Sequence, residues 1–579
     1  MSRTLLLART FFGRLFESDL MPPGLPQAQL VIWSMAFLAT PGLLLPVRFA
    51  AVFLGAPRNP RAVDVLPLLL LHRLLFITLS MTAIGLVALV IWDGMFPDRR
   101  DARILGGLPV PGRTIIAGRL LALAALCGIF VLGINAVPTV LNGPLLPMVD
   151  GASNSFRGAA AHFLATSMSG IFVFSTLLML QGIVLNIGGR KAADRLSLVL
   201  QVVFIAALLQ MIFFMPRMVA VVRSDLGAGW IRALPSLWFV GLYDVIAGRP
   251  RPASGPLAAM ALAATLGTVS AAVGLFTFTH ARLMRRAIES AESPRHNKIA
   301  VALVRLVTRG LCWHPVARAT FEFTLKTIAR SRSHRLLMAM YVGLAIAIVA
   351  SAVVPLMIGR GFAAFLEPDI EVLSAPLVIA FFTLIGARVA LAIPVEPKAT
   401  WVFKLAEPAN RGAAMDGVRA ALVVTGVLPT TVVAAASVGL LWGPRAAAIH
   451  ALVCFLMGWA LVEILLIRMF KIPFTCTYFP GRSRFTKLWP LYLTAFTTYC
   501  FTTAKLVKTV FLEARTWEPL AYFVLLTTIS IALLTWTRRR SLRREAGLKF
   551  EEEPLDEMFA GFNLSEGFAA GTKESRQLR

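Results

Sequence analysis

Residues Leu66–Trp92 read LPLLLLHRLLFITLSMTAIGLVALVIW, an almost unbroken apolar run. The run is longer than the roughly 20 residues that a helix needs to cross the hydrocarbon core of a bilayer. Over the whole chain of 579 residues, 57% are hydrophobic, 15% are charged, and the mean hydropathy is +0.75. Soluble domains carry roughly 25% charged residues. The sequence therefore predicts an all-α polytopic membrane protein.

Other apolar runs of similar length occur along the chain, and hydropathy predicts about twelve transmembrane helices in two groups of six. The predicted spans are Ala28–Pro46, Leu66–Trp92, Thr114–Leu141, Ala159–Leu185, Leu196–Val222, Pro256–His280, Leu336–Ile358, Ser374–Val395, Met415–Trp442, Arg445–Phe470, Leu488–Lys508 and Glu518–Thr537.

The distribution of the 57 lysines and arginines predicts the orientation of these spans. Most of them fall on one side, and positive residues concentrate in cytoplasmic loops. We therefore expect a multi-pass protein of the inner (plasma) membrane with both termini in the cytoplasm. Phosphates of the inner leaflet are the nearest anions for the formal charge of +27, so we expect membrane lipids and not nucleic acid as its partners.

A basic stretch divides the chain into two halves that repeat. The predicted organisation is an amphipathic interfacial segment (1–27), a first six-helix half (28–280), a basic cytoplasmic linker (281–335), a second six-helix half (336–537) and a polar cytoplasmic tail (538–579). Four short motifs recur in order at a nearly constant offset, which indicates an internal parallel duplication. The pairs are Phe16-Glu17 with Phe321-Glu322, Phe96-Pro97 with Ile393-Pro394, Gly118-Arg119 with Gly417-Val418-Arg419, and Gly189-Arg190 with Gly481-Arg482.

The first residues predict a helix that lies along the membrane surface. An apolar face recurs at helical spacing, with Arg14 and Glu17 opposite it, as an interfacial helix requires. The segment lacks a small-residue cleavage site, so we expect no removable signal peptide. The residues of the predicted apolar face are Leu5, Ala8, Phe12, Leu15 and Phe16.

A charged segment bounded by prolines stands between the second and third spans. Its charges alternate in sign, and Ile104 and Leu105 add apolar contacts before Pro109. The pattern suits a short surface helix that docks a cytoplasmic partner, although a solvated turn that only follows the positive-inside bias would read similarly. A comparable segment follows the eighth span, and two docking segments imply a partner present in two copies. The predicted docking residues are Asp98, Arg99, Arg100, Asp101 and Arg103 in the first segment and Glu396, Lys398, Trp401 and Lys404 in the second.

Two stretches resemble the membrane permeases of second-type ABC exporters. They are FPDRRDARILGGLPVPGRTIIAGR (Phe96–Arg119) and ALPSLWFVGLYDVIAG (Ala233–Gly248); PFTCTYFPGRSR (Pro473–Arg484) is also similar, without an assigned role. The resemblance implies that the first stretch is a coupling helix touching a separate ATP-binding subunit. It also implies an extracellular hairpin between spans five and six, which would carry Trp238, Phe239 and Tyr243. The second half departs from this pattern because only a short connection joins its last two spans.

The ATP-binding machinery is expected in that partner. The nearest string to a phosphate-binding loop, Gly567–Lys573, has the wrong spacing for G-x-x-x-x-G-K-[ST]. We therefore predict no cofactor in this chain, with ATP and Mg²⁺ bound by the partner subunit. The five cysteines show no metal-ligand or disulfide spacing, and no catalytic motif occurs, so we also predict that the chain is not an enzyme.

The alternative is an ion-coupled secondary transporter of the major facilitator type. Gly94, Asp98 and Arg99 begin its loop motif, but the glycine and the basic pair that should follow are missing. Carriers of this kind usually hold carboxylates or histidines within the membrane. Here Glu463 is the only acidic residue well inside a span, and we expect an ion pair with Arg468 or Arg388 in preference to proton coupling. Arg388 should face protein or water, because an arginine at a helix centre costs roughly 2.5–3.5 kcal/mol.

Overall fold

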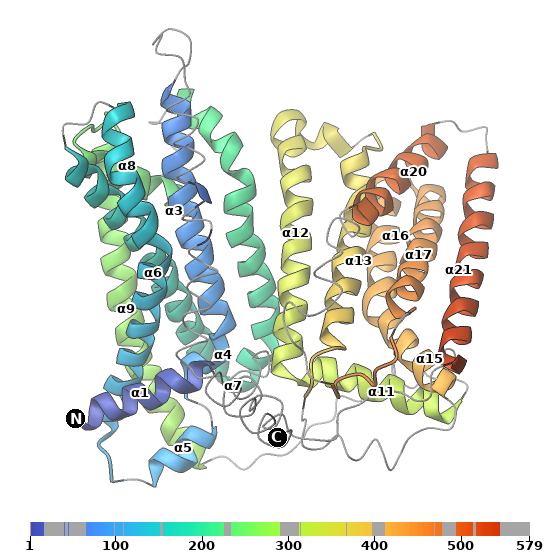
Figure 1. The fold of residues 1–579 in the computed structure, drawn as a ribbon, viewed down its shortest axis with the longest axis horizontal. Coiled ribbons are helices and arrows are strands. Elements are labelled where there is room, and N and C mark those ends of the chain that lie inside the picture. The colour runs from blue at the N-terminus through green and yellow to red at the C-terminus, as the bar shows by residue number, and fades with distance from the viewer. Residues whose placement is uncertain are drawn as a thin grey trace, which may run out of the picture. The chain divides into compact units, whose positions relative to one another are not determined.

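The computed structural model describes residues 2–16, 40, 44–45, 65–97, 99–107, 109–150, 154–224, 233–289, 312, 314–365, 367–395, 411–467, 469–476, 494–512 and 517–544. These residues form helices and no β-strand. The helices are α1 (Arg3–Phe16), α3 (Val65–Val90), α4 (Trp92–Met95), α5 (Arg99–Gly106), α6 (Gly112–Asp150), α7 (Ser155–Ser224), α8 (Pro235–Ala247), α9 (Ser254–Glu289), α11 (Pro315–Arg330), α12 (Arg332–Arg360), α13 (Ile370–Ala390), α15 (Arg411–Leu422), α16 (Leu428–Trp442), α17 (Pro444–Leu466), α20 (Thr503–Leu512) and α21 (Glu518–Arg544) (Figure 1).

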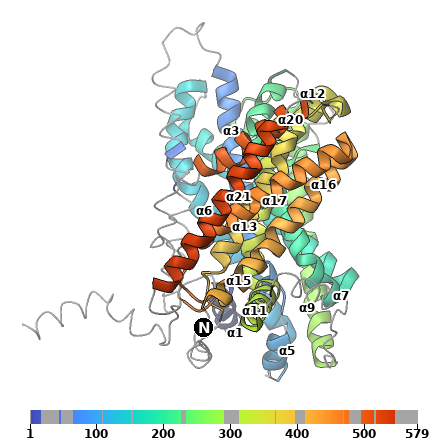
Figure 2. The same cartoon turned by 90° about the vertical axis from the view of Figure 1, so that its right-hand side faces the viewer.

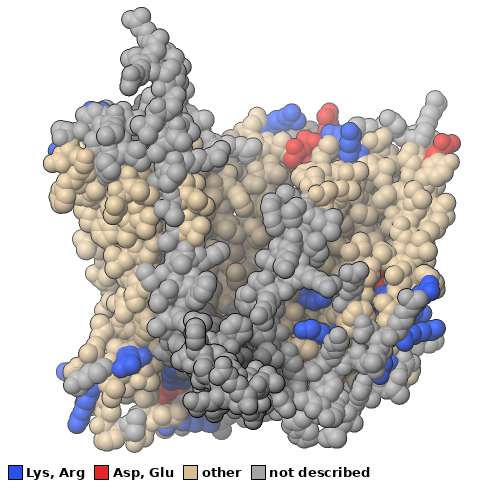
Figure 3. All heavy atoms as spheres, in the orientation of Figure 1, with Lys and Arg blue, Asp and Glu red and all other residues tan. Residues whose placement is uncertain are grey.

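The chain divides into two compact units. Unit 1 comprises Met1–Glu17 and Pro26–Ser293, and unit 2 comprises Ser18–Leu25 and Pro294–Arg579. The boundary at Ser293 falls inside the basic stretch that the sequence predicts as a linker. On the face drawn in Figure 3, charged side chains gather toward the ends of the long helices, with a broad uncharged surface between them. That distribution suits helices whose middles lie in hydrocarbon.

The described residues contain ten helical segments that are long and apolar enough to cross a membrane, so the prediction of an all-α polytopic membrane protein is confirmed. Each coincides with one of the predicted spans. Of the remaining two, Ala28–Pro46 falls almost wholly outside the described residues, and Leu488–Lys508 is described only from 494 onward. The count of twelve therefore stays a prediction. The ten segments are Leu68–Val90, Gly112–Asn142, Ser155–Gly188, Leu196–Met215, Ser254–Met284, Arg332–Ala363, Ile370–Ala390, Arg411–Trp442, Pro444–Leu466 and Glu518–Arg543.

Helix α7 holds two of these segments, and contacts with α3 and with α4, which follows it, show that they run in opposite directions. In the first segment, the contacting residue of α7 advances as α3 advances. In the second segment, the contacting residue of α7 moves back along the chain as α3 and α4 advance. The chain therefore turns back between the two, within the range Ser155–Ser224 of α7. The contacts are Ser80 with Thr166 and Trp92 with Gln181 in the first segment, and Thr82 with Leu208 and Asp93 with Ser197 in the second.

Each unit has an amphipathic helix that lies across the ends of its long helices (Figure 1). In unit 1, α1 crosses α6 at Gly118, where an added Cβ would lie 3.0 Å from the Leu7 Cβ. In unit 2, α11 crosses α15 at Gly417, where an added Cβ would collide with the carbonyl of Ala317. The two glycines are one of the predicted repeat pairs. Their equivalent use supports the duplication inferred from the sequence.

The buried face of α1 differs from the predicted one. Ala8 and Phe11 are buried against α6, whereas Leu5 is 49% exposed. Arg14, which was expected on the polar face, instead pairs with Asp101 of α5. The apolar residues of α1 therefore cover two surfaces, one that packs on protein and one that remains open.

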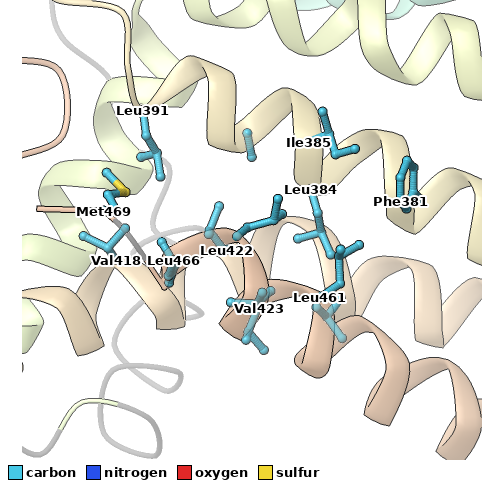
Figure 4. Packing of buried hydrophobic residues seen from close by; sticks show 14 of the residues in the cluster. Phe381, Leu384, Ile385, Leu391, Val418, Leu422, Val423, Leu461, Leu466 and Met469 are labelled. Carbon is cyan, nitrogen blue, oxygen red and sulfur yellow. The ribbon is translucent and has the colours of Figure 1, made fainter. Parts of the chain in front are cut away.

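Unit 2 has its main core where α13, α15 and α17 meet. Figure 4 shows Leu384, Leu422 and Leu461, one from each of these helices, with their side chains directed toward one another. A quarter turn brings α21 into view beside α17 (Figure 2). Helices α17 and α21 run parallel, because Arg445 lies over the Trp517 ring at one end and Glu463 pairs with Arg538 at the other. The connection from the end of α17 to the start of α21 must therefore return to the end at which α17 begins.

Candidate functional site

The first docking segment is built around Arg119, near the start of α6. Its guanidinium donates to three consecutive carbonyls at the end of α4: Nη2 to Gly94 at 2.7 Å and to Phe96 at 3.0 Å, and Nε to Met95 at 3.1 Å. The last carbonyls of a helix lack partners within the helix, and the planar guanidinium offers five donors in a fixed fork. Arg119 therefore fixes the chain where it leaves the second span.

Arg119 also holds α5. Its Nη1 donates to Oδ2 of Asp101 at 2.7 Å, while Arg14 of α1 donates to the other oxygen, Oδ1. Asp101 is 3% exposed and Arg119 is 7% exposed. Burial alone would raise the pKa of Asp101, but the hydrogen bonds and charges of Arg119 and Arg14 outweigh it and hold the pKa below its usual value. The ionised carboxylate thus joins α1, α5 and α6.

Apolar contacts complete the attachment of α5. Leu105 packs against a small cluster that contains Phe11 and Ile115, and the Arg119 guanidinium lies 5.4 Å from the centroid of the Phe11 ring. On the other side of α5, Arg103 and Ile104 are exposed, Ile104 by 53%. The helix is therefore anchored on one face and open on the other.

The structure covers the predicted docking residues unevenly. It places Asp101 and Arg103, and it includes the backbone of Arg99 and Arg100 in α5. Asp98 and the whole second segment, with Glu396, Lys398, Trp401 and Lys404, lie outside the described residues. Sequence reasoning missed that Arg14 and Arg119 belong to this site. Arg119 could have been found, because the Gly118-Arg119 motif is one of the repeat pairs.

The intramembrane carboxylate of unit 2 is paired, and its described partners are other arginines than Arg388. Glu463 of α17 is fully buried and accepts from Arg538 Nε at 3.0 Å and from Arg419 Nη1 at 3.2 Å. Arg388, one of the expected partners, donates from Nε to the Leu465 carbonyl at 3.0 Å, so it faces protein as predicted. The side chain of the other, Arg468, lies outside the described residues. The expectation of an ion pair is confirmed, and its assignment to Arg388 is wrong.

Arg119 and Arg419, which belong to one predicted repeat pair, make similar contacts. Arg119 follows Gly118 and bonds Asp101, while Arg419 follows Gly417 and bonds Glu463. Each therefore ties the start of its unit's third span to a buried carboxylate. Unit 2 adds a second link, because Arg538 also bonds Asp416 of α15 at 2.9 Å.

The residues predicted for an interfacial or re-entrant hairpin lie on α8, which is buried. Phe239 and Tyr243 are 0% and 1% exposed, and Trp238 is half-buried. Helix α8 packs closely on α9, since a Cβ at Gly241 would lie 2.5 Å from the Leu257 Cβ. The chain turns between the two helices at Gly248, whose φ of +80° favours glycine. A helical hairpin therefore forms, but its short helix is part of the packed bundle.

An ion network fixes α8 to α3. The fully buried carboxylate of Asp244 accepts from Arg73 of α3 at 2.6 Å, from Arg251 at 2.6 Å and from the Ser254 hydroxyl at 2.9 Å. Sequence reasoning missed this network because Arg73 lies 171 residues from Asp244 along the chain. Within the described residues, no group of three His, Cys, Asp or Glu side chains is placed to hold a metal ion.

Comparison of the chain with protein-family models, with curated proteins and with solved structures finds no match.

Proposed function

We propose that the chain is the membrane permease component of an ATP-driven exporter, which forms a translocation pathway and couples to a separate ATP-binding subunit. The observation that carries the proposal is the attachment of α5. This short helix is anchored through Asp101 and exposes Arg103 and Ile104 outward. The resemblance of Phe96–Arg119 to a coupling helix supports the same assignment.

The anchoring suits a part that transmits movement. A partner that displaces α5 pulls on Asp101, and Asp101 pulls on Arg119, which also holds the carbonyls of 94–96. Separating a buried ion pair costs about 3–5 kcal/mol. Movement of the whole group is therefore favoured over rupture within it. The ends of the second and third spans would then move together with α5.

The second docking segment, Glu396–Lys404, would receive a second copy of the same subunit. ATP and Mg²⁺ would be held by these partner copies, and the pathway would open as they close and part. Mixed-sign charges suit such docking surfaces, because complementary charges fix the register and the choice of partner more than they add affinity.

The ion-coupled carrier receives less support. Proton coupling needs a carboxylate that gains and loses a proton during the cycle. Glu463 accepts from Arg538 at one carboxylate oxygen and from Arg419 at the other, so both oxygens are held by side chains of the bundle. This geometry favours a structural role for Glu463.

The exposed face of α5 gives the test of the proposal. Changing Arg103→Glu together with Ile104→Asp is expected to lower capture of the ATP-binding subunit by at least about tenfold, because both side chains would lie in the interface. Co-purification from membranes measures the effect. The matched control is Ile358→Asp with Arg360→Glu, an exposed pair at the far end of α12. Equal capture by the α5 variant and the wild type would refute docking on α5.

The proposed orientation has its own test. The Arg282–Arg335 linker is expected in the cytoplasm, so a cysteine introduced as Ala291→Cys should react with an impermeant thiol reagent only after the cells are permeabilised. The background should be low, because all five native cysteines are buried. Labelling of Ala291→Cys in intact cells would place the linker outside and reverse the orientation.

A further inference from the structure

The stretch that follows α17 is buried although it is not helical. Ile472, Phe474, Thr475 and Cys476 are 8%, 3%, 2% and 5% exposed. Buried backbone must find hydrogen-bond partners, since water is not at hand. These residues begin the Pro473–Arg484 stretch, for which the sequence suggests no role.

The partners lie at the end of α13. The Phe474 N–H donates to the Leu391 carbonyl at 3.0 Å, and the Phe474 carbonyl accepts from the Val395 N–H at 3.2 Å. The two bonds bracket Ile393-Pro394, the motif that pairs with Phe96-Pro97 in the repeat. Directly after it comes the segment 396–410, which holds the second predicted docking element.

The Phe474 ring in addition contacts α11 and α12. It lies 5.7 Å from the Phe323 ring of α11 and 5.0 Å from the His334 ring of α12, measured between ring centroids. His334 Nε2 is itself 3.1 Å from the Ile393 carbonyl oxygen, within hydrogen-bond distance. Phe474, with its neighbours, thus joins α11 and α12 to the residues that lead into the second docking segment.

The backbone of Phe474 is strained. Its φ of +64° makes it the one non-glycine residue with positive φ among the described residues. A bulky side chain disfavours this region, so the conformation persists only where the surroundings enforce it, and such positions cluster at functional sites.

We propose that Phe474 is a positioning residue that latches the entry of the second docking segment to α11 and α12. In unit 1, Arg119 performs the equivalent task by holding the carbonyls of 94–96. In unit 2, Phe474 and His334 hold Leu391, Ile393 and Val395. The contacts of Phe474 and His334 support the latch directly. Its part in transmitting movement rests on the proposed function.

The latch is tested by hydrogen exchange on the purified chain. Phe474→Gly keeps the positive φ accessible but removes the ring, and the Val395 amide should then exchange at least about fivefold faster, as expected for a weakened hydrogen bond. The control is Met469→Ala, because Met469 is equally buried in the same segment but its N–H bonds Leu466. Unchanged exchange at Val395 in Phe474→Gly, or an equal increase in Met469→Ala, would overturn the latch.

Transmission is tested on the complex with the ATP-binding subunit. In the wild type and in Met469→Ala, adding ATP, Mg²⁺ and vanadate should change the exchange of amides in α11 and α12. In Phe474→Gly the subunit should remain bound while this change falls by more than half. A nucleotide-dependent change of full size in Phe474→Gly would refute transmission through Phe474. A wild-type chain that holds no ATP-binding subunit would instead refute the proposed function and leave the exchange result at Val395 standing.

Discussion

Replacing Arg119 with methionine is expected to destabilise unit 1 by about 3–5 kcal/mol, the usual cost of removing one partner of a buried ion pair. The Asp101 carboxylate would lose its buried partner and keep Arg14, whose side chain is 36% exposed. The carbonyls of Gly94, Met95 and Phe96 would lose the donor that holds them. Unfolding in mild detergent measures the loss of stability.

A second variant separates stability from coupling. Adding Asp101→Leu to Arg119→Met removes the uncompensated charge and should restore much of the stability, while capture of the ATP-binding subunit stays low because α5 has lost its anchor. The control is Arg113→Met, which removes an exposed arginine from the same end of α6. Full capture by the stabilised double variant would show that the anchor serves folding alone.

Replacing Glu463 with leucine is expected to cost unit 2 about 3–5 kcal/mol, for the same reason. Arg538 is 1% exposed and would be left with Asp416 alone. Because little else of α21 is buried, this pair should dominate how firmly the helix is held. Changing Arg538→Leu in the same chain removes the stranded charge and should recover most of the loss. The measurement is again the unfolding transition in detergent.

The control for Glu463 is Glu518→Leu, an exposed carboxylate at the start of α21. It should change stability by less than about 0.5 kcal/mol, as surface substitutions usually do. If the chain were instead an ion-coupled carrier, the result for Glu463 would differ. In that case Glu463→Gln would leave stability and capture of the ATP-binding subunit unchanged and yet abolish transport.

Long helices and their order could be predicted because lipid leaves a chain few options. Every backbone group in hydrocarbon must be paired within the segment, so an apolar run such as Leu66–Trp92 has to be a helix. The same constraint predicted the two oppositely directed segments of α7 as separate spans. Gly118 and Gly417, one of the predicted repeat pairs, both lie where an amphipathic helix crosses closely.

Side-chain pairing could not be predicted in the same way. Hydropathy places charges along their own helices but does not show which helices pack together, so the deepest arginine, Arg388, and the nearby Arg468 appeared as partners for Glu463. The partners that the structure describes are Arg538 and Arg419, and Arg538 comes close because α21 packs on α17. The aromatic residues of α8 suggested an interfacial or re-entrant segment. Asp244, paired with Arg73, is what draws that helix into the bundle.

The central claim is that ATP is bound by a separate polypeptide that docks on this chain. Photolabelling the chain, purified from its own membranes, with a reactive ATP analogue and Mg²⁺ tests it directly. The expected result is a label on a second polypeptide, present in stoichiometric amount and lost in the Arg103→Glu, Ile104→Asp variant. A label on this chain itself, or a wild-type preparation that carries no ATP-binding polypeptide, would contradict the claim.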